Sequence, residues 1–168
     1  DGITVQNGEI IYNNVGNEYV SIIGLDKNGV LILEEMSVKE IKEKEIQHAV
    51  TFQPYLLLNG IPQIEGDGGW GLAPRTGIGQ RSDGTIIFVV IDGRQPGWSM
   101  GATLRDLMNV FIEYQALNAA NLDGGSSTEM YYNGQIINRL WNVFGERYMP
   151  TAFIVVLNDE QNNKGETD

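Results

Sequence analysis

The chain has 168 residues, 42% of them hydrophobic, and a formal net charge of −11, which is enough for one cored domain. It contains no cysteine, so thiol nucleophiles, disulfides and thiolate metal sites are excluded. No basic face is present to neutralise a run of nucleic-acid phosphates, and no apolar stretch reaches the length that spans a membrane.

The two kinds of positive side chain occupy different parts of the chain. All five lysines lie outside residues 71–150 and all six arginines lie inside, where seven acids leave a net charge of only −1. Guanidinium groups pair with phosphate or carboxylate through two hydrogen bonds at once. The middle of the chain is therefore where we expect an anion to bind.

The first third predicts two hairpins and a helix. Residues 3–12 turn at Asn7-Gly8, and residues 19–33 turn at 27–29. Residues 37–48 indicate an exposed helix, with Ser37 and Glu40 at the spacing of a capping box. The single histidine, His48, falls in this helix, where a structural role is expected.

The middle third predicts the framework of a site. A strand over 55–58 precedes a glycine-rich loop, 65–71, which is either a plain surface loop or a flap over a site. Strands follow over 75–80 and 85–91, the second buried on both faces, then a helix capped by Thr103 that ends near Ala116, and a short strand over 119–122. This succession predicts that Asp92 and Asp123, which each follow a strand, lie at the same edge of one sheet.

The last third predicts a hairpin over 129–138 and a final buried strand over 148–157. Between them, Trp141 and Phe144 either stack on sugar rings or anchor their loop. The expected fold class is α+β: a mixed β-sheet with hairpins and two main helices in a single domain. Residues 1–50 contribute the N-terminal hairpins and helix, 51–157 the core, and 158–168 a polar tail.

Several interpretations of the candidate site remain open on these grounds. Hydrolysis at a sugar carbon uses paired carboxyl groups, for which Asp123 and Asp92 are the candidates. With a phosphate leaving group, arginine and backbone N–H donors hold the developing charge instead. Either acid can also be an ordinary turn residue, and Arg75 and Arg94 can be ion-pair partners of these acids. A Ca²⁺ or Mg²⁺ site built from Asp92, Asp123 and Glu129 is a further alternative, whereas a single histidine makes a Ser-His-Asp triad very unfavourable.

Four segments together resemble the phosphodiester glycosidase domain family, which includes N-acetylglucosamine-1-phosphodiester α-N-acetylglucosaminidase and bacterial exported proteins linked to exopolysaccharides. They are residues 74–79 (Pro-Arg-Thr-Gly-Ile-Gly), 92–94 (Asp-Gly-Arg), 121–127 (Asn-Leu-Asp-Gly-Gly-Ser-Ser) and 147–150 (Arg-Tyr-Met-Pro). The resemblance covers about residues 55–157 well. It implies a secreted or envelope-associated bacterial hydrolase that cleaves a sugar-1-phosphodiester and needs no cofactor.

The resemblance also implies that Asp123, Gly124, Gly125 and Ser127 line the site, with Arg75, Thr76, Asp92 and Arg94 beside them. The individual roles are our own hypothesis, in which Asp123 and Asp92 are the catalytic residues. The substrate- and phosphate-binding residues are then expected to be Arg75, Thr76, Arg94, Gly124, Gly125, Ser126, Ser127 and Arg147. Ser126 replaces a third glycine of many members, and Glu129 stands where threonine is commoner. Family domains usually carry an upstream segment with an Asn-Gly-Gly-Phe-like motif, so an upstream piece of the same precursor is an expected partner. The alternative function is a non-catalytic module that binds anionic glycans of the cell envelope.

Overall fold

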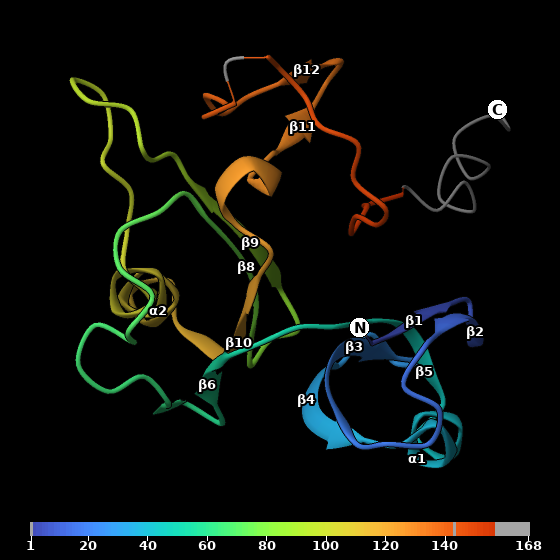
Figure 1. The fold of residues 1–168 in the computed structure, drawn as a ribbon. Coiled ribbons are helices and arrows are strands. Elements are labelled where there is room, and N and C mark those ends of the chain that lie inside the picture. Colours follow the sequence, from blue (N-terminus) through green and yellow to red (C-terminus); the bar gives the residue numbers. More distant parts are fainter. Residues whose placement is uncertain (1, 143, 157–168) are drawn as a thin grey trace, which may run out of the picture.

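The computed structural model describes residues 2–142 and 144–156, and in these ranges the protein is built mainly of antiparallel β-sheets with two α-helices (Figure 1). The expected α+β class with a mixed sheet is therefore wrong, because strands predominate over the two helices and every strand pairing among the described residues is antiparallel. The molecule is a small β domain with added helices. Within the described ranges, no helix has the length and apolar character needed to cross a bilayer.

The N-terminal sheet consists of five strands in the order β2-β1-β5-β3-β4. Its two hairpins are those predicted, and Asn7 and Gly8 turn the first with φ values of 51° and 78°. The strands are β1 (Ile3–Gln6), β2 (Glu9–Asn13), β3 (Val20–Asp26), β4 (Leu31–Met36) and β5 (Ile46–Thr51).

Helix α1 (Val38–Glu43) is shorter than the predicted helix over 37–48. It begins at the predicted capping box of Ser37 and Glu40. It ends because Glu45 adopts φ 52° and turns the chain into β5. His48 consequently lies exposed on a strand and not on a helix.

The central sheet also has five strands, in the order β7-β6-β10-β8-β9. They are β6 (Tyr55–Leu58), β7 (Ile61–Pro62), β8 (Arg75–Arg81), β9 (Ile86–Ile91) and β10 (Ala116–Leu122). Strand β9 was expected to be fully buried, but all its residues are half-buried because it forms the edge of the sheet.

Helix α2 (Leu104–Glu113) packs on one face of the central sheet. Thr103 and Asp106 form its capping box, as the sequence predicts. The ring of Phe111 lies against Gly77 and Gly79 of β8: a Cβ on either glycine would be 2.7–2.8 Å from the ring. The two glycines thus provide the flat surface that a bulky aromatic side chain needs.

The layers follow the order α1, N-terminal sheet, central sheet, α2 (Figure 1). Alternation along strands sends successive residues into different cores, so Ile22 faces α1 whereas Ile23 faces the central sheet. The buried Gln80 of β8 joins the sheets, because its side chain accepts from the Leu31 N–H and donates to the Gly29 carbonyl.

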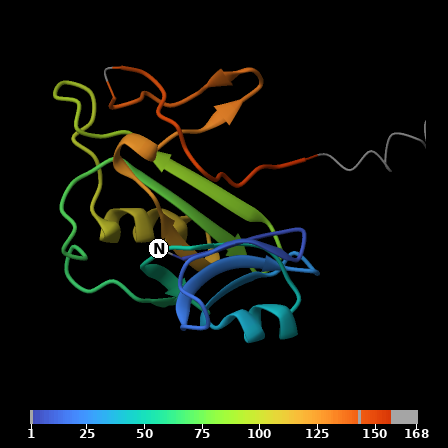
Figure 2. The ribbon, with the colours of Figure 1, turned by 45° about the vertical axis from the view of Figure 1, so that its right-hand side comes forward.

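The remaining chain leaves the central sheet through a 3-10 turn, η1 (Gly125–Ser127), and the hairpin β11 (Tyr131–Tyr132) and β12 (Gln135–Ile136) (Figure 2). The strand predicted over 148–157 is absent from 148–156, where Ile154, Val155 and Val156 are exposed. β-branched residues form a strand only when a neighbouring strand pairs with them, and no described strand pairs with residues 148–156. Leu157 and the predicted tail 158–168 lie outside the described residues.

Candidate active site

Three strand ends define the candidate site. Strands β9 and β10 both run antiparallel to β8, so their C-terminal ends flank the start of β8. In this register Arg75 pairs with Ile91, and Thr76 pairs with Leu122. Asp92 and Asp123 therefore follow strands at the same edge of one sheet, as expected, with the start of β8 between them.

Glycines bring these strand ends together around the backbone of Pro74. A Cβ on Gly93 would be 2.6 Å from the Pro74 nitrogen, and a Cβ on Gly124 would be 2.6 Å from the Pro74 oxygen. Both distances are far below contact, so only glycine fits at either position. The N–H of Gly125 donates to the same Pro74 oxygen at 2.9 Å. This amide was expected to bind the substrate but is already used by the fold.

Arg75 is held in place by backbone carbonyl groups. It is only 4% exposed, its Nε donates to Ala102 O at 2.9 Å, and its Nη2 donates to Gly71 O at 2.6 Å. Burial and, secondly, the positive charge of Arg94 lower the pKa of Arg75. A guanidinium remains protonated in proteins, so the result is a fixed and poorly hydrated positive charge.

Arg94 supplies a second positive charge beside the first. Its backbone has a positive φ of 56°, and its guanidinium lies 4.9 Å from the ring centre of Trp141. Within residues 2–142 and 144–156, neither Arg75 nor Arg94 forms an ion pair with a carboxylate. The interpretation of these arginines as internal ion-pair partners is therefore not supported.

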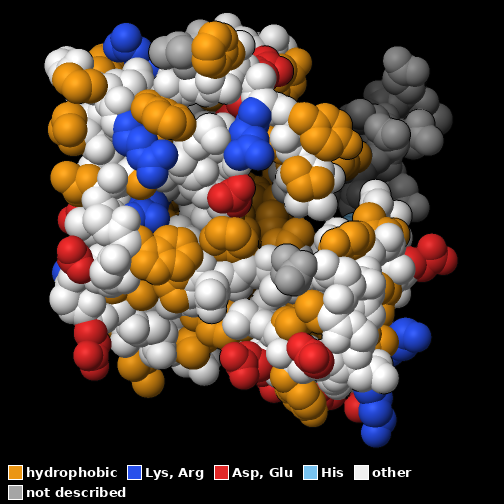
Figure 3. Space-filling view, viewed as in Figure 1, with side chains coloured by type: hydrophobic (Ala, Val, Ile, Leu, Met, Phe, Trp, Pro, Cys, Tyr) orange, Lys and Arg blue, Asp and Glu red, His pale blue; other side chains and the backbone are white. Residues whose placement is uncertain are grey.

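These groups surround a cavity of about 400 Å³. Asp123 is exposed in its wall, and none of the described residues donates a hydrogen bond to its carboxylate. Figure 3 shows one face of the molecule, and over the upper half of that face positive side chains gather among hydrophobic ones. The cavity is lined by Phe52, Trp70, Ala73, Arg75, Arg94, Leu122, Asp123, Gly124, Gly125 and Ser126.

Asp92 does not line this cavity, although the sequence suggested it as the second carboxylate. Its side chain accepts hydrogen bonds from Trp98 Nε1 at 2.8 Å, from the Arg139 N–H at 3.0 Å and from Asn138 Nδ2 at 3.3 Å. The carboxylate thus joins the loop that holds Trp98 to the segment after β12. The end of strand β9 fixes the position of the Asp92 backbone. It does not fix the direction in which the Asp92 side chain points.

The expected hydroxyl groups and the last arginine lie around η1. Ser126 lines the cavity, and Arg147 Nη1 donates to the hydroxyls of Ser126 at 3.1 Å and Ser127 at 3.3 Å. Thr76 instead donates to the buried Thr128 at 3.2 Å and lies outside the lining. Arg147 thus contacts the two serines and is not itself part of the lining.

Glu129 lies beyond the cavity. Burial and, secondly, the charge of Glu146 raise the pKa of Glu129, and one of its carboxylate oxygens is buried without a hydrogen-bond partner among the described residues. In the part of the chain that the structure describes, no three His, Asp or Glu side chains gather in a way that suits a metal ion. Asp92, Asp123 and Glu129 thus do not converge on the cation site considered from the sequence.

The sequence reasoning missed two aromatic residues of the cavity. Trp70 belongs to the glycine-rich loop 65–71, which was weighed as a flap, and its ring lies 5.9 Å from the Arg75 guanidinium. A lone aromatic residue in such a loop was the available signal. Phe52 comes from the link between the two sheets, where no local pattern marks it.

The chain belongs to the phosphodiester glycosidase family, whose sequence profile matches residues 1–156. It is 34% identical over 91 residues to the SPbeta prophage-derived uncharacterized protein YomE of Bacillus subtilis (strain 168). The matched region covers 54% of this chain and 14% of that protein.

Two solved structures show related folds. The zebrafish N-acetylglucosamine-1-phosphodiester alpha-N-acetylglucosaminidase catalytic domain, auto-inhibited by its pro-peptide, superposes with a TM-score of 0.72 at 21% identity, over 84% of this chain and 51% of that one. A hypothetical protein from Synechocystis matches with a TM-score of 0.50 at 28% identity, over 66% and 22% of the two chains. The chain thus spans about half of the zebrafish domain and a smaller part of the other relatives.

Proposed function

We propose that the protein hydrolyses the bond between the anomeric carbon of a sugar, such as N-acetylglucosamine, and a phosphodiester. The observation that supports this most is the pair of guanidinium groups, Arg75 and Arg94, that face one cavity without a carboxylate partner among the described residues. Holding two positive charges together away from water costs free energy unless an anion binds between them. Asp123 in the same wall then supplies the carboxylate for chemistry at the sugar.

The proposed roles follow from where each group is held. Arg75 and Arg94 bind the phosphate, and because backbone carbonyls already fix Arg75, little reorganisation is needed as charge develops. Cleavage of the anomeric C–O bond leaves its electron pair on the phosphate, which is a good leaving group and needs no acid. One carboxylate in the cavity is then sufficient.

Asp123 acts at the anomeric carbon either as the base that takes a proton from water or as the nucleophile. The product distinguishes these roles, because attack by water inverts the anomeric configuration whereas a covalent intermediate retains it. Proton NMR of the freshly released sugar records which anomer forms first. Asp92 is proposed as a positioning residue that holds the loops behind Arg94.

The test is release of sugar from a p-nitrophenyl phosphodiester of N-acetylglucosamine 1-phosphate. We expect Asp123→Asn to lower kcat by about 10²-fold or more, by analogy with the loss of an acid–base group, with little change in substrate binding. Asp83→Asn is the matched control, because Asp83 lies at the β8–β9 turn and pairs with Arg81. If the Asp123→Asn protein releases sugar at the same rate as the wild-type protein, the proposal is contradicted.

A non-catalytic module for anionic envelope glycans is the second candidate. It is favoured by two further arginine–aromatic pairs at the surface, Arg94 with Trp141 and Arg139 with Trp98. Such pairs stack on sugars and attract acidic groups. The same experiment separates the two functions: a binding module releases no sugar and retains a charged polysaccharide equally well with Asp123→Asn.

A further inference from the structure

The chain contains four Asn-Gly pairs, and the structure sets one of them apart. All four asparagines are exposed. Three of the turns share one backbone shape, since φ is 51° at Asn7, 51° at Asn59 and 49° at Asn133. The pairs are Asn7-Gly8, Asn28-Gly29, Asn59-Gly60 and Asn133-Gly134.

An Asn-Gly pair can rearrange without an enzyme. The backbone nitrogen of the glycine gives up its proton and attacks the side-chain carbonyl carbon of the asparagine. A C–N bond forms, the bond to the amide nitrogen breaks, and ammonia leaves. Water then opens the resulting succinimide ring at one of its two carbonyl groups, which gives aspartate or isoaspartate. A glycine N–H that donates to a carbonyl must first lose that hydrogen bond, so the bond slows the reaction.

Three of the four glycine N–H groups donate to a backbone carbonyl. The donors and acceptors are Gly8 with Gln47 at 2.9 Å, Gly29 with Asp26 at 3.0 Å and Gly60 with Leu117 at 2.7 Å. Gly134 differs, because none of the described residues accepts a hydrogen bond from its N–H. A Cβ on Gly134 would have nothing within 4 Å, so this turn is also open to water.

The turn at Asn133 belongs to the smallest sheet. Strands β11 and β12 have two residues each and form a sheet of two strands, and Figure 1 shows them apart from both five-stranded sheets. The hairpins that turn at Asn7 and Asn59 are instead joined to a third strand, β5 and β10 respectively. A two-stranded hairpin is marginally stable in water, so the Asn133 turn opens more readily than the other two.

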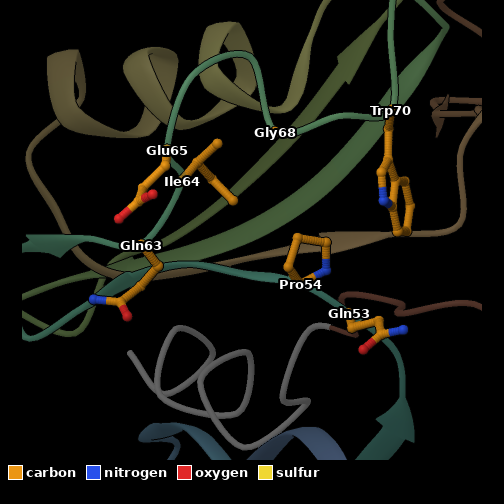
Figure 4. Close-up of a pocket in the computed structure, with 7 residues that line it drawn as sticks. All are labelled: Gln53, Pro54, Gln63, Ile64, Glu65, Gly68 and Trp70. Atoms are coloured by element: carbon orange, nitrogen blue, oxygen red, sulfur yellow. The ribbon is translucent and has the colours of Figure 1, made fainter.

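The hairpin at Asn59 is held at both ends and provides the matched comparison. Strand β6 pairs with β10, and the loop after β7 is drawn in Figure 4, where Gln63, Ile64 and Glu65 border a pocket of about 390 Å³. Arg105 of α2 fixes this loop, because its Nη2 donates to Ile64 O at 2.8 Å. The Asn59 turn thus has the dipeptide and the φ of the Asn133 turn in a constrained setting.

We infer that Asn133 is a site of spontaneous covalent modification, at which the protein loses a side-chain amide and forms isoaspartate ahead of its other three Asn-Gly pairs. The modification adds one negative charge to the turn. In the isoaspartate form the backbone also runs through the former side chain, which lengthens a turn that has only two residues between β11 and β12.

The test is peptide mapping by tandem mass spectrometry while the whole folded protein is incubated at mildly alkaline pH. The mass gain that accompanies conversion of an amide to an acid is scored, because the Asp-Gly pairs isomerise without a change in mass. We expect Asn133 to react about tenfold faster than Asn7 and Asn59, since one hydrogen bond fewer has to be broken. Equal or faster reaction at Asn7, Asn28 or Asn59 would overturn the inference.

Unfolded protein and two variants provide the controls. In urea the four asparagines should react at similar rates, and an excess at Asn133 that persists there would show that the sequence, and not the fold, selects it. Asn133→Gln should abolish the product at this position, because glutamine would have to form a larger ring. Asn59→Gln is the matched variant, since φ is 51° there and 49° at Asn133, and it should leave the reaction at Asn133 unchanged. A slower reaction at Asn133 in Asn59→Gln would contradict a process confined to the β11–β12 turn.

Discussion

Two residues without side chains determine whether the site can assemble. Gly93 and Gly124 each follow an aspartate at a strand end, and each places its Cα against the backbone of Pro74. An Asp-Gly pair therefore has a packing function here beyond turn formation. The acid needs the glycine behind it because any larger residue pushes the two strand ends apart.

Alanine at Gly124 tests this at the residue scale. The added methyl group would meet the carbonyl oxygen of Pro74, the residue before β8, so Gly124→Ala should destabilise the protein by about 1–3 kcal/mol and displace Asp123. Urea unfolding measures the first effect and sugar release the second. Gly97→Ala is the control for the contact: alanine at Gly97 carries backbone strain because its φ is 84°, whereas that of Gly124 is −113°, but its Cβ would meet open space and should leave Asp123 in place. Equal stability and activity of Gly124→Ala and wild type would refute the packing role.

The identities of the site residues were more predictable than their contacts. The sequence placed Asp123, Arg75 and Arg94 in one neighbourhood, because strand ends and charge distribution can be read along the chain. It assigned Asp92 to the cavity and the Gly125 N–H to the ligand, and the structure uses both within the fold. A hydrogen bond to a residue about 46 positions away, as from Asn138 to Asp92, leaves no local pattern.

At the scale of elements, helix starts were predictable and helix ends were not. Both capping boxes were recognised, at Ser37 and at Thr103. The helices end through Glu45 at φ 52° and Gln115 at φ 61°, and this left-handed backbone is usually marked by glycine. Because neither residue is glycine, the sequence predicted that the first helix continues to residue 48, inside β5, and that the second ends near Ala116.

The contact between α2 and β8 allows a double-mutant test. Phe111→Ala should cost about 3–5 kcal/mol of unfolding free energy, since it opens a cavity. Gly79→Ala should cost about 1–3 kcal/mol, since its Cβ would lie 2.7 Å from the Phe111 ring. The double variant should lose at least about 1 kcal/mol less than the two costs together, because alanine at 111 makes room for the methyl group. If the losses in unfolding free energy of the two single variants simply add up in the double variant, this packing is contradicted. The control pair is Gly79→Ala with Ile41→Val, whose losses should add up because the two residues belong to separate cores.

At the scale of the whole molecule, the sequence missed how the strands are ordered. The succession β9, α2, β10 indicated a mixed sheet, and the two strands do run in the same direction. However, β8 is inserted between them, so every contact in the sheet is antiparallel. Which strand occupies that position depends on register and packing across the whole chain, and no local pattern reports it.

The joint between the two sheets gives a prediction on pH. The hydroxyl of Tyr55 on β6 donates to Ile22 O on β3 at 3.1 Å, and burial raises the pKa of Tyr55 from 10.0 to about 12. Between these values the unfolded chain loses the proton while the folded protein keeps it, so the free energy of unfolding should fall as pH rises from 10 to 12. Urea midpoints should fall less steeply over this window in Tyr55→Phe. An identical pH dependence in the two proteins would show that Tyr55 does not contribute.

The position of β10 has a consequence for when the cavity forms during folding. Ala120 pairs with Tyr55 and Asn121 pairs with Gly77, so the middle strand of the central sheet joins segments that are synthesised well before it. Closing such long loops costs entropy before any contact repays it, which makes this pairing a late event in folding. A nascent chain that has not yet extruded β10 has Arg75 and Arg94 but lacks the strand that leads into Asp123, so the cavity forms only when β10 has paired.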